Sequence, residues 1–192
     1  MMAWRNRLEC FALLAILAAT VVGCASSSLS TAGASAPGSP SAPARAQDTD
    51  DHFQLVFELP KTIWRTTEEV TGKATLALVT PTSMTVWGSG SGILGFGFAQ
   101  VGGDKNVGWI RTADCGPRQL EASTPLVSPI TKTPSYSESA PPTDFYRVFG
   151  TDPLIHLPAG DWRISAVTDF TEDGCGGTRH ELQAALVIHV VA

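Results

Sequence analysis

Three acidic residues near the end of the chain, Asp169, Glu172 and Asp173, are the first candidates for chemistry. Closely spaced carboxylates can act as the general acid and base of a hydrolase, or can bind calcium through their oxygens. The same residues also suit the solvated tip of a β-hairpin, which is the interpretation we favour. A cell-envelope hydrolase that uses these loop carboxylates is the alternative that the residues leave open.

Two of the four cysteines, Cys115 and Cys175, fall in turn sequences of the globular part of the chain. An even pair of cysteines in an exported domain is typical of a disulfide. The pair does not form a C-x-x-C motif, and no His–Cys spacing indicates zinc. We therefore predict a disulfide that joins two loops at one end of the domain. Closing a loop of about 60 residues would stabilise the fold by roughly 4 kcal/mol on the chain-entropy model.

The four histidines are dispersed along the sequence and predict no metal site. His180 and His189 are nine positions apart on what the pattern predicts to be a single strand. Side chains at that spacing point to opposite faces of a strand, so these two cannot bind one metal ion together. His52 and His156 stand alone, and a structural or surface role is the simpler interpretation of each.

A G-x-G-x-x-G motif occupies residues 90–95, and Asp114 follows about 20 residues later. In a dinucleotide-binding fingerprint this motif opens a helix, whose N-terminus receives the pyrophosphate. Here the motif runs into an alternating, strand-like segment. We therefore predict a Gly/Ser loop between strands and no cofactor. The G-x-S-x-G and H-E-x-x-H motifs are also absent from the sequence.

Tryptophan is frequent for a domain of this size, and most of these residues are expected in the core. Trp87 stands just before the Gly/Ser loop, and Trp109 lies in a short strand-like run. Aromatic side chains at loop edges can form a stacking or hot-spot surface. Trp87 and Trp109 are therefore the candidates for a binding surface.

The first 23 residues have the pattern of an export signal, which must be set aside before the fold is considered. Arg5 and Arg7 form a positive start, and an apolar run over 11–22 follows. The run ends in Val21-Val22-Gly23-Cys24, which resembles the lipobox of bacterial lipoproteins. The resemblance implies cleavage before Cys24 and a diacylglycerol thioether on its thiol. Two or three acyl chains would then anchor the protein firmly to the outer face of a bacterial membrane.

Residues 24–51 are predicted to comprise the lipidated Cys24 and a disordered tether that follows it. Ala, Ser, Pro, Gly and Thr dominate this segment, which cannot bury enough apolar surface to offset its ordering entropy. As a flexible chain it would reach about 25–30 Å in r.m.s. terms. The Ser/Thr and Pro content leaves a sugar-decorated stalk open as an alternative.

Residues 52–192 are predicted to fold as an all-β domain, because apolar residues recur there with a period of two. No convincing helical stripe follows the signal. Many short strands with Gly/Pro turns favour an Ig-like, two-sheet antiparallel β-sandwich. The strands are expected at 53–59, 73–80, 84–86, 96–100, 107–111, 145–149, 154–157, 162–170 and 182–190.

One local pattern resembles a known family of domains. Leu157-Pro158-Ala159-Gly160-Asp161-Trp162 is similar to the L-x-x-G-x-[YW] entry to a late strand in Ig-like sandwiches, including BsuPI-type intracellular proteinase inhibitors. Residues 57–78 resemble the opening of such domains. The likeness covers about half of the domain and implies the architecture. It also adds an alternative function, a peptidase inhibitor that acts through sandwich loops.

Composition and charge narrow the remaining classes of function. Of the 192 residues, 43% are hydrophobic and 16% charged, the net charge is −5, and no basic run occurs. Nucleic acid is therefore excluded as an expected partner. We predict a lipid-anchored envelope lipoprotein that acts as a non-enzymatic binding or scaffolding module. Its expected partners are membrane lipid, through Cys24, and an envelope protein or a small ligand.

Overall fold

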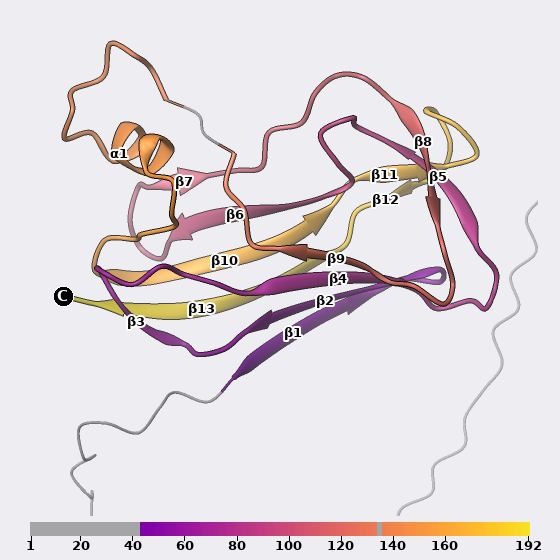
Figure 1. Ribbon diagram of the computed structural model, residues 1–192, viewed down its shortest axis with the longest axis horizontal. Helices are drawn as coiled ribbons and strands as arrows, with labels where there is room; N and C mark the ends of the chain where they lie inside the picture. Colours follow the sequence, from indigo (N-terminus) through magenta and orange to yellow (C-terminus); the bar gives the residue numbers. More distant parts are fainter. Residues whose placement is uncertain (1–42, 134–135) are drawn as a thin grey trace, which may run out of the picture. The chain divides into compact units, whose positions relative to one another are not determined.

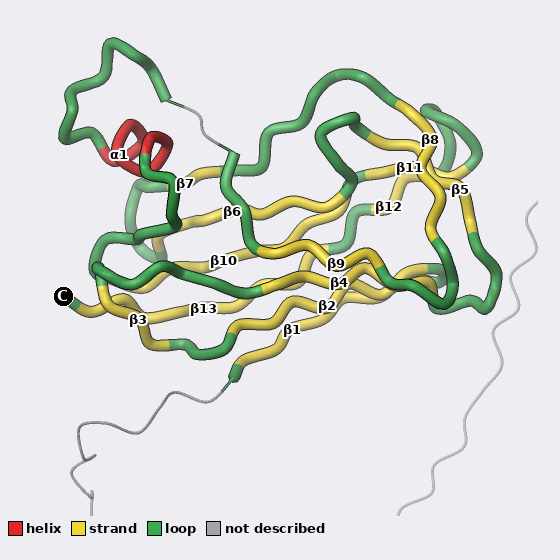
Figure 2. Tube along the Cα trace, viewed as in Figure 1, coloured by secondary structure: helices red, strands yellow, loops and turns green. Residues whose placement is uncertain are grey.

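The computed structural model describes residues 43–133 and 136–192 of the chain (Figure 1). The predicted signal peptide, the lipidation site at Cys24 and most of the predicted tether lie outside these residues. The described residues contain thirteen strands and one short helix, joined by loops. This confirms the all-β prediction (Figure 2). None of the helical structure in these ranges has the length and apolar character that crossing a membrane requires.

The first sheet has four strands. They are β1 (Ala44–Thr49), β2 (Phe53–Leu59), β4 (Lys73–Leu78) and β9 (Leu126–Pro129). Their order is β1-β2-β4-β9, and each neighbouring pair is antiparallel.

The second sheet has five strands. They are β3 (Ile63–Arg65), β6 (Leu94–Gln100), β7 (Asn106–Val107), β10 (Gly160–Thr168) and β13 (Gln183–Val191). Their order is β3-β13-β10-β6-β7, and β3 pairs with β13 in parallel. This parallel pair departs from the prediction of purely antiparallel sheets.

The core lies between these two sheets, as the period-two pattern predicts. The alternate residues of β2, β6, β10 and β13 supply most of the large, fully buried side chains. Among them are Phe53, Leu55, Phe57, Leu59, Phe96, Phe98, Trp162, Ile164, Ile188 and Val190. Burying one such Phe, Leu or Ile side chain stabilises the fold by about 1.5–3 kcal/mol.

A third, smaller sheet extends the sandwich at the end that carries the disulfide. Its strands are β5 (Met84–Gly88), β8 (Gly116–Leu120), β11 (Phe170–Glu172) and β12 (Arg179–His180), in the order β12-β11-β5-β8. Only Asp169 separates β10 from β11, and its N–H donates to the carbonyl of Ile93 at 3.1 Å. The chain therefore passes from β10 in the second sheet directly to β11 in the third (Figure 1).

The predicted end of the tether at residue 51 is wrong. Residues Ala44–Thr49 form β1 and pair with β2 in a regular antiparallel ladder. The strand alternates between half-buried and exposed residues, but its half-buried positions include Ala46 and Asp48 rather than large apolar side chains. An edge strand of this composition has no hydrophobic period. It forms because its backbone groups pair with those of β2.

The strand predicted at 145–149 is also wrong, because residues Phe145–Thr151 form helix α1. The Asp144 side chain caps this helix by accepting from the N–H groups of Tyr146 and Arg147. Phe145 and Phe149 lie one helical turn apart and stack at 5.5 Å between ring centroids. Over five residues, a pair at i and i+4 fits both periods, so the pattern alone cannot separate helix from strand.

Two other expected strands need correction, and two strands form where none was expected. Residues 154–157 form no strand, and of the run predicted at 107–111 only Val107, the second residue of β7, lies in a strand. In the Pro- and Ser-rich region after Pro117, β8 and β9 form although no clear pattern marks them. Figure 1 shows α1 beside β7, at the opposite end of the sandwich from β5, β8, β11 and β12.

Candidate functional site

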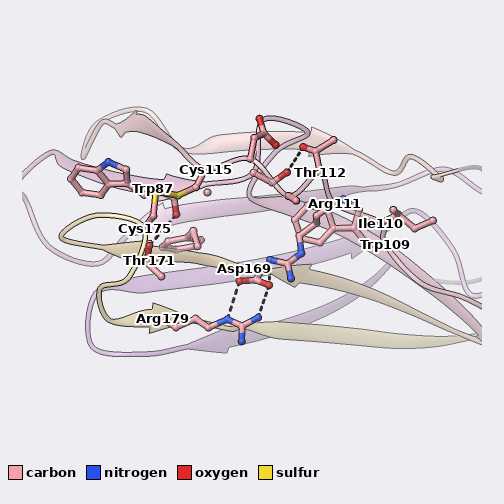
Figure 3. A pocket seen from close by; sticks show the side chains of 15 residues that line it. Trp87, Trp109, Ile110, Arg111, Thr112, Cys115, Asp169, Thr171, Cys175 and Arg179 are labelled. Carbon is pink, nitrogen blue, oxygen red and sulfur yellow. Dashed lines mark hydrogen bonds and ion pairs between the residues drawn. A yellow bond between two sulfur atoms is a disulfide. The ribbon is translucent and has the colours of Figure 1, made fainter.

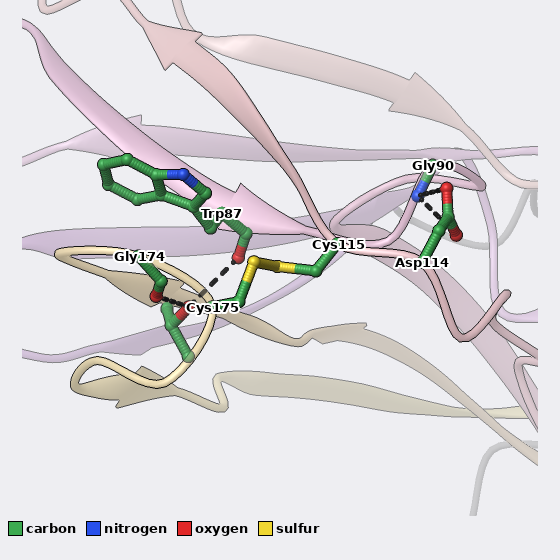
Figure 4. Close-up of a disulfide and its surroundings, with 7 residues drawn as sticks. Trp87, Gly90, Asp114, Cys115, Gly174 and Cys175 are labelled. Carbon is green, nitrogen blue, oxygen red and sulfur yellow. Dashed lines mark hydrogen bonds between the residues drawn. A yellow bond between two sulfur atoms is a disulfide. The ribbon is translucent and has the colours of Figure 1, made fainter.

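The predicted disulfide between Cys115 and Cys175 is present, with their Cα atoms 6.0 Å apart (Figure 4). Cys115 immediately precedes β8, and Cys175 lies in the turn between β11 and β12. The hydroxyl of Thr171, on β11, donates to the carbonyl of Gly174 in that turn at 2.6 Å. The bridge therefore ties the start of one edge strand to the hairpin at the opposite edge of the third sheet.

A pocket of about 670 Å³ opens beside the disulfide (Figure 3). Its lining comes from β5, from the segment 109–115 and from the hairpin β11–β12. Trp87 and Trp109, the two predicted binding residues, both line it, and both are half-buried. The structure thus places both predicted binding residues in the lining of one pocket.

One carboxylate organises the charge of this pocket. Asp169 accepts from Arg179 Nε at 3.0 Å and from Arg179 Nη2 at 2.7 Å, and Arg111 pairs with the same carboxylate. The hydrogen bonds from Arg179, with the added charge of Arg111, hold the pKa of Asp169 below its usual value despite its burial. Asp169 is therefore ionised at neutral pH and poorly suited to donate a proton.

Trp109 is held from two sides. Its ring packs against Gly95 of β6, where a Cβ would lie 2.1 Å from Trp109 Cδ2. The guanidinium carbon of Arg111 lies 5.7 Å from the ring centroid, within the range of a cation–π contact. The position of the indole is therefore set by the absence of a side chain at residue 95 and by an arginine that is itself bound to Asp169.

The first four residues of the G-x-G-x-x-G motif, 90–93, form the predicted loop between β5 and β6, and its last two begin β6. An isolated bridge joins Ser89 to Gly92, and the chain continues directly into strand β6 rather than a helix. Asp114 accepts from the N–H of Gly90 with both oxygens at 3.1 Å. Hydrogen bonds from Thr112 and from this N–H lower the pKa of Asp114. The loop is thus fastened to the rim of the pocket.

The three candidate carboxylates do not converge on one site. Asp169 lies in the pocket with the arginines, whereas Glu172 contacts His52 and His180. Asp173 is exposed in the hairpin turn, where its φ of 55° is the left-handed conformation of a tight turn. This arrangement supports the hairpin-tip interpretation for Asp173 alone.

A second cluster, which the sequence analysis missed, lies around His180. Glu172 Oε1 is 2.6 Å from His52 Nδ1 and 3.1 Å from His180 Nε2. Asp50 Oδ2 is 2.7 Å from His180 Nδ1, across 130 residues of sequence. We refer to His52, Glu172 and His180, with Asp50 behind them, as the histidine cluster. His52 stands alone in the sequence but not in the structure, where its partly exposed, hydrogen-bonded side chain agrees with the structural or surface role predicted for it.

The hydrogen bonds of the histidine cluster shift the ionisation of two of its members. The hydrogen bond to Glu172 raises the pKa of His52. Burial alone would raise the pKa of Asp50, but hydrogen bonds from His180 and from the N–H groups of His52 and Phe53 outweigh it and lower the pKa. Asp50 is thus a carboxylate that accepts a hydrogen bond from His180 Nδ1.

No spacing rule could have found the histidine cluster. His52 lies in the turn between β1 and β2, whereas Glu172 and His180 end β11 and β12. His180 and His189, predicted on one strand, in fact lie on the separate strands β12 and β13. The one available signal is the alternation of β11, which places Phe170 and Glu172 on the same face.

The resemblances to bacterial lipoproteins and to BsuPI-type inhibitor domains remain predictions. The first depends on residues 21–24, which lie outside the described ranges. The second concerns a local pattern that an Ig-like sandwich of any function would share. No protein-family model matches this chain, and neither a curated protein nor a solved structure matches it.

Proposed function

We propose that this protein is a lipid-anchored binding module of the bacterial cell envelope, and that the pocket at the disulfide end is its ligand site. The lipobox-like sequence at Cys24 supports the anchor. The observation that carries the binding site is the pocket itself, whose lining contains Trp87, Trp109 and the arginine pair centred on Asp169. Because Arg111 and Arg179 neutralise the charge of Asp169, a binding role suits this site better than acid–base catalysis.

The lining indicates the chemistry of the ligand. Indole faces offer apolar contact area, and each guanidinium has five N–H donors, more than one shared carboxylate accepts. Hydroxyls of Thr112 and Thr171 lie in the same lining. The ligand is therefore a group with an apolar face and several hydrogen-bond acceptors, carried by a small molecule or by the surface of an envelope protein.

The site is rigid enough to be pre-formed. The disulfide, the Asp169–Arg179 pair and the Asp114–Gly90 contacts fasten three separate segments around the pocket. A site that is already ordered loses little conformational entropy when it binds a partner. The pocket is therefore expected to bind its partner as a pre-formed surface, without a folding step coupled to binding.

In-cell photo-crosslinking of the full-length lipoprotein tests the proposal. A photoreactive residue at Thr112, in the pocket, should capture a partner, and the same residue at Val127 on β9 should not. Val127 is a matched control because it is exposed and lies on a different sheet. Trp109→Ala should reduce the capture at Thr112. Equal capture at both positions, or none at Thr112, would count against the pocket, and a captured protease would favour the inhibitor alternative.

A further inference from the structure

We propose that His52, Glu172 and His180 form a binding site for one divalent transition-metal ion, and that Zn²⁺ is the ion that suits this donor set. Two imidazoles and one carboxylate are the ligands of many zinc sites, where a fourth position stays open to water or substrate. One possible ligand atom from each residue lies within 4.8 Å of the other two. The three come from three separate places in the chain.

His180 carries the strongest sign of a metal ligand. The residue is only 8% exposed, and its ring stacks on Phe170 at 5.4 Å and meets the edge of Phe53 at 4.7 Å. A carboxylate can only accept, so Nδ1 donates its hydrogen to Asp50. In the neutral imidazole, Nε2 then carries a lone pair, and it lies 3.1 Å from Glu172 Oε1.

This lone pair has no hydrogen-bond partner. Within residues 43–133 and 136–192, only His180 Nε2 and the Thr80 hydroxyl are buried side-chain polar atoms without one. Nε2 does lie 3.1 Å from Glu172 Oε1, but the angles of that contact are not those of a hydrogen bond. A buried acceptor facing a carboxylate oxygen is costly unless a cation lies between them.

The spacing of the donor atoms fits such a cation. Zinc binds imidazole nitrogen and carboxylate oxygen at about 2.0–2.2 Å, so two such ligands at a tetrahedral angle are about 3.4 Å apart. The observed 3.1 Å between His180 Nε2 and Glu172 Oε1 is close to this value. His52 Nδ1, now 2.6 Å from the same oxygen, needs only a small shift to become the third ligand.

The surroundings also resemble a metal site beyond the first three ligands. A ligating histidine usually donates its other N–H to a carboxylate, which fixes the tautomer and the ring orientation. Asp50 does this for His180, and the same Asp50 accepts from the N–H groups of His52 and Phe53 at 2.9 and 2.7 Å. Asp50 therefore both orients the His180 ring and positions the turn that carries His52. The His52 side chain is 41% exposed, which leaves the site open to ions from solvent.

The metal site and the pocket lie on opposite faces of one hairpin. Phe170 pairs with His180 and Thr171 pairs with Arg179 across β11 and β12. Alternation therefore directs Glu172 and His180 to one side, and Thr171 and Arg179 to the pocket. The metal site goes beyond the proposed function. A negative result for zinc binding would leave the pocket proposal intact, and the reverse also holds.

Zinc binding to the full-length protein, purified in detergent without a histidine tag, tests the proposal. After equilibrium dialysis with Zn²⁺ alone, metal analysis should find one ion per chain. His52→Ala and Glu172→Gln should each weaken the affinity by at least about 10–100-fold, the effect usually seen when only a second-shell partner of a ligand is lost. Neither variant removes a core side chain, so both should keep the disulfide and the far-UV spectrum of the original protein.

His189→Ala is the matched control. His189 Nδ1 lies 2.7 Å from Asp161 Oδ1, the same kind of histidine–carboxylate pair without a third ligand, and the variant should bind Zn²⁺ as the original protein does. Co²⁺ provides a second readout, because its visible absorption bands should appear with the original protein and be lost with His52→Ala. The proposal is overturned if the original protein binds no Zn²⁺ at a roughly tenfold molar excess. It is equally overturned if His52→Ala and Glu172→Gln bind as well as His189→Ala.

Discussion

Trp109 lies flat against Gly95, and the contact leaves no room for a Cβ at residue 95. The two residues are on separate segments, one in β6 and the other in the strand-free stretch that leads to Arg111. Gly95 therefore has a packing role. Because it has no side chain, the Trp109 ring, which lines the pocket, can pack directly against the backbone of β6.

Gly95→Ala should displace the Trp109 ring and destabilise the fold by about 1–3 kcal/mol, the usual effect of forcing extra volume into a packed contact. Urea unfolding measures the loss. Gly97→Ala is the control, because a Cβ there would lie an ordinary 3.6 Å from the carbonyl of Val107. If the two variants unfold at the same urea concentration, the Trp109 contact does not constrain residue 95.

Cys115→Ser and Cys175→Ser should have the same effect on stability, because each removes the same bridge. The expected loss is about 2–5 kcal/mol in the free energy of unfolding. Denaturant unfolding of both variants and of the double variant measures it. A loss in only one single variant, or additive losses in the double variant, would contradict a shared disulfide.

Asp169→Asn should change how stability depends on pH. The pKa of Asp169 is lowered in the folded protein by Arg179 and Arg111, so its contribution is present above the unfolded value of about 3.9. That contribution is lost as the pH falls through the lower, folded value. We therefore expect the original protein to lose stability below about pH 4 and the variant to lose less.

The variant should also be less stable at pH 7, by about 1–3 kcal/mol, because two guanidiniums lose their carboxylate. Thermal unfolding at pH 7 and at about pH 3 separates the two effects. Asp104→Asn is a suitable comparison, because the Asp104 side chain is 95% exposed. If Asp169→Asn and the original protein show parallel pH profiles, the ion pairs contribute nothing to acid stability.

Cys24→Ser should abolish lipidation without changing the folded domain, because it removes the thiol that is predicted to carry the diacylglycerol. Metabolic labelling with a radioactive fatty acid measures the modification. The original protein should take up the label, and the variant should not. A labelled Cys24→Ser protein would contradict the lipobox assignment.

Local patterns were sufficient to predict several features of this protein. The alternation of β2, β10 and β13 indicates the buried face of each strand, because side-chain direction reverses at every residue of an extended chain. The turn sequences around Cys115 and Cys175 place both cysteines in loops at a strand end, and export favours their oxidation. Trp87 and Trp109 could be selected in the same way, from their positions at loop edges.

Other features depend on partners far away in the sequence. Strand β1 lacks a hydrophobic period and forms by backbone pairing with the edge of β2. A helix, α1, forms where a strand was predicted, and the Asp144 side chain caps its N-terminus. The histidine cluster joins the β1–β2 turn to the ends of β11 and β12. Strand periodicity, set by local stereochemistry, could therefore be predicted from the sequence alone. Register and strand neighbours, which decide whether His52 meets His180, result from long-range packing that only the tertiary structure specifies.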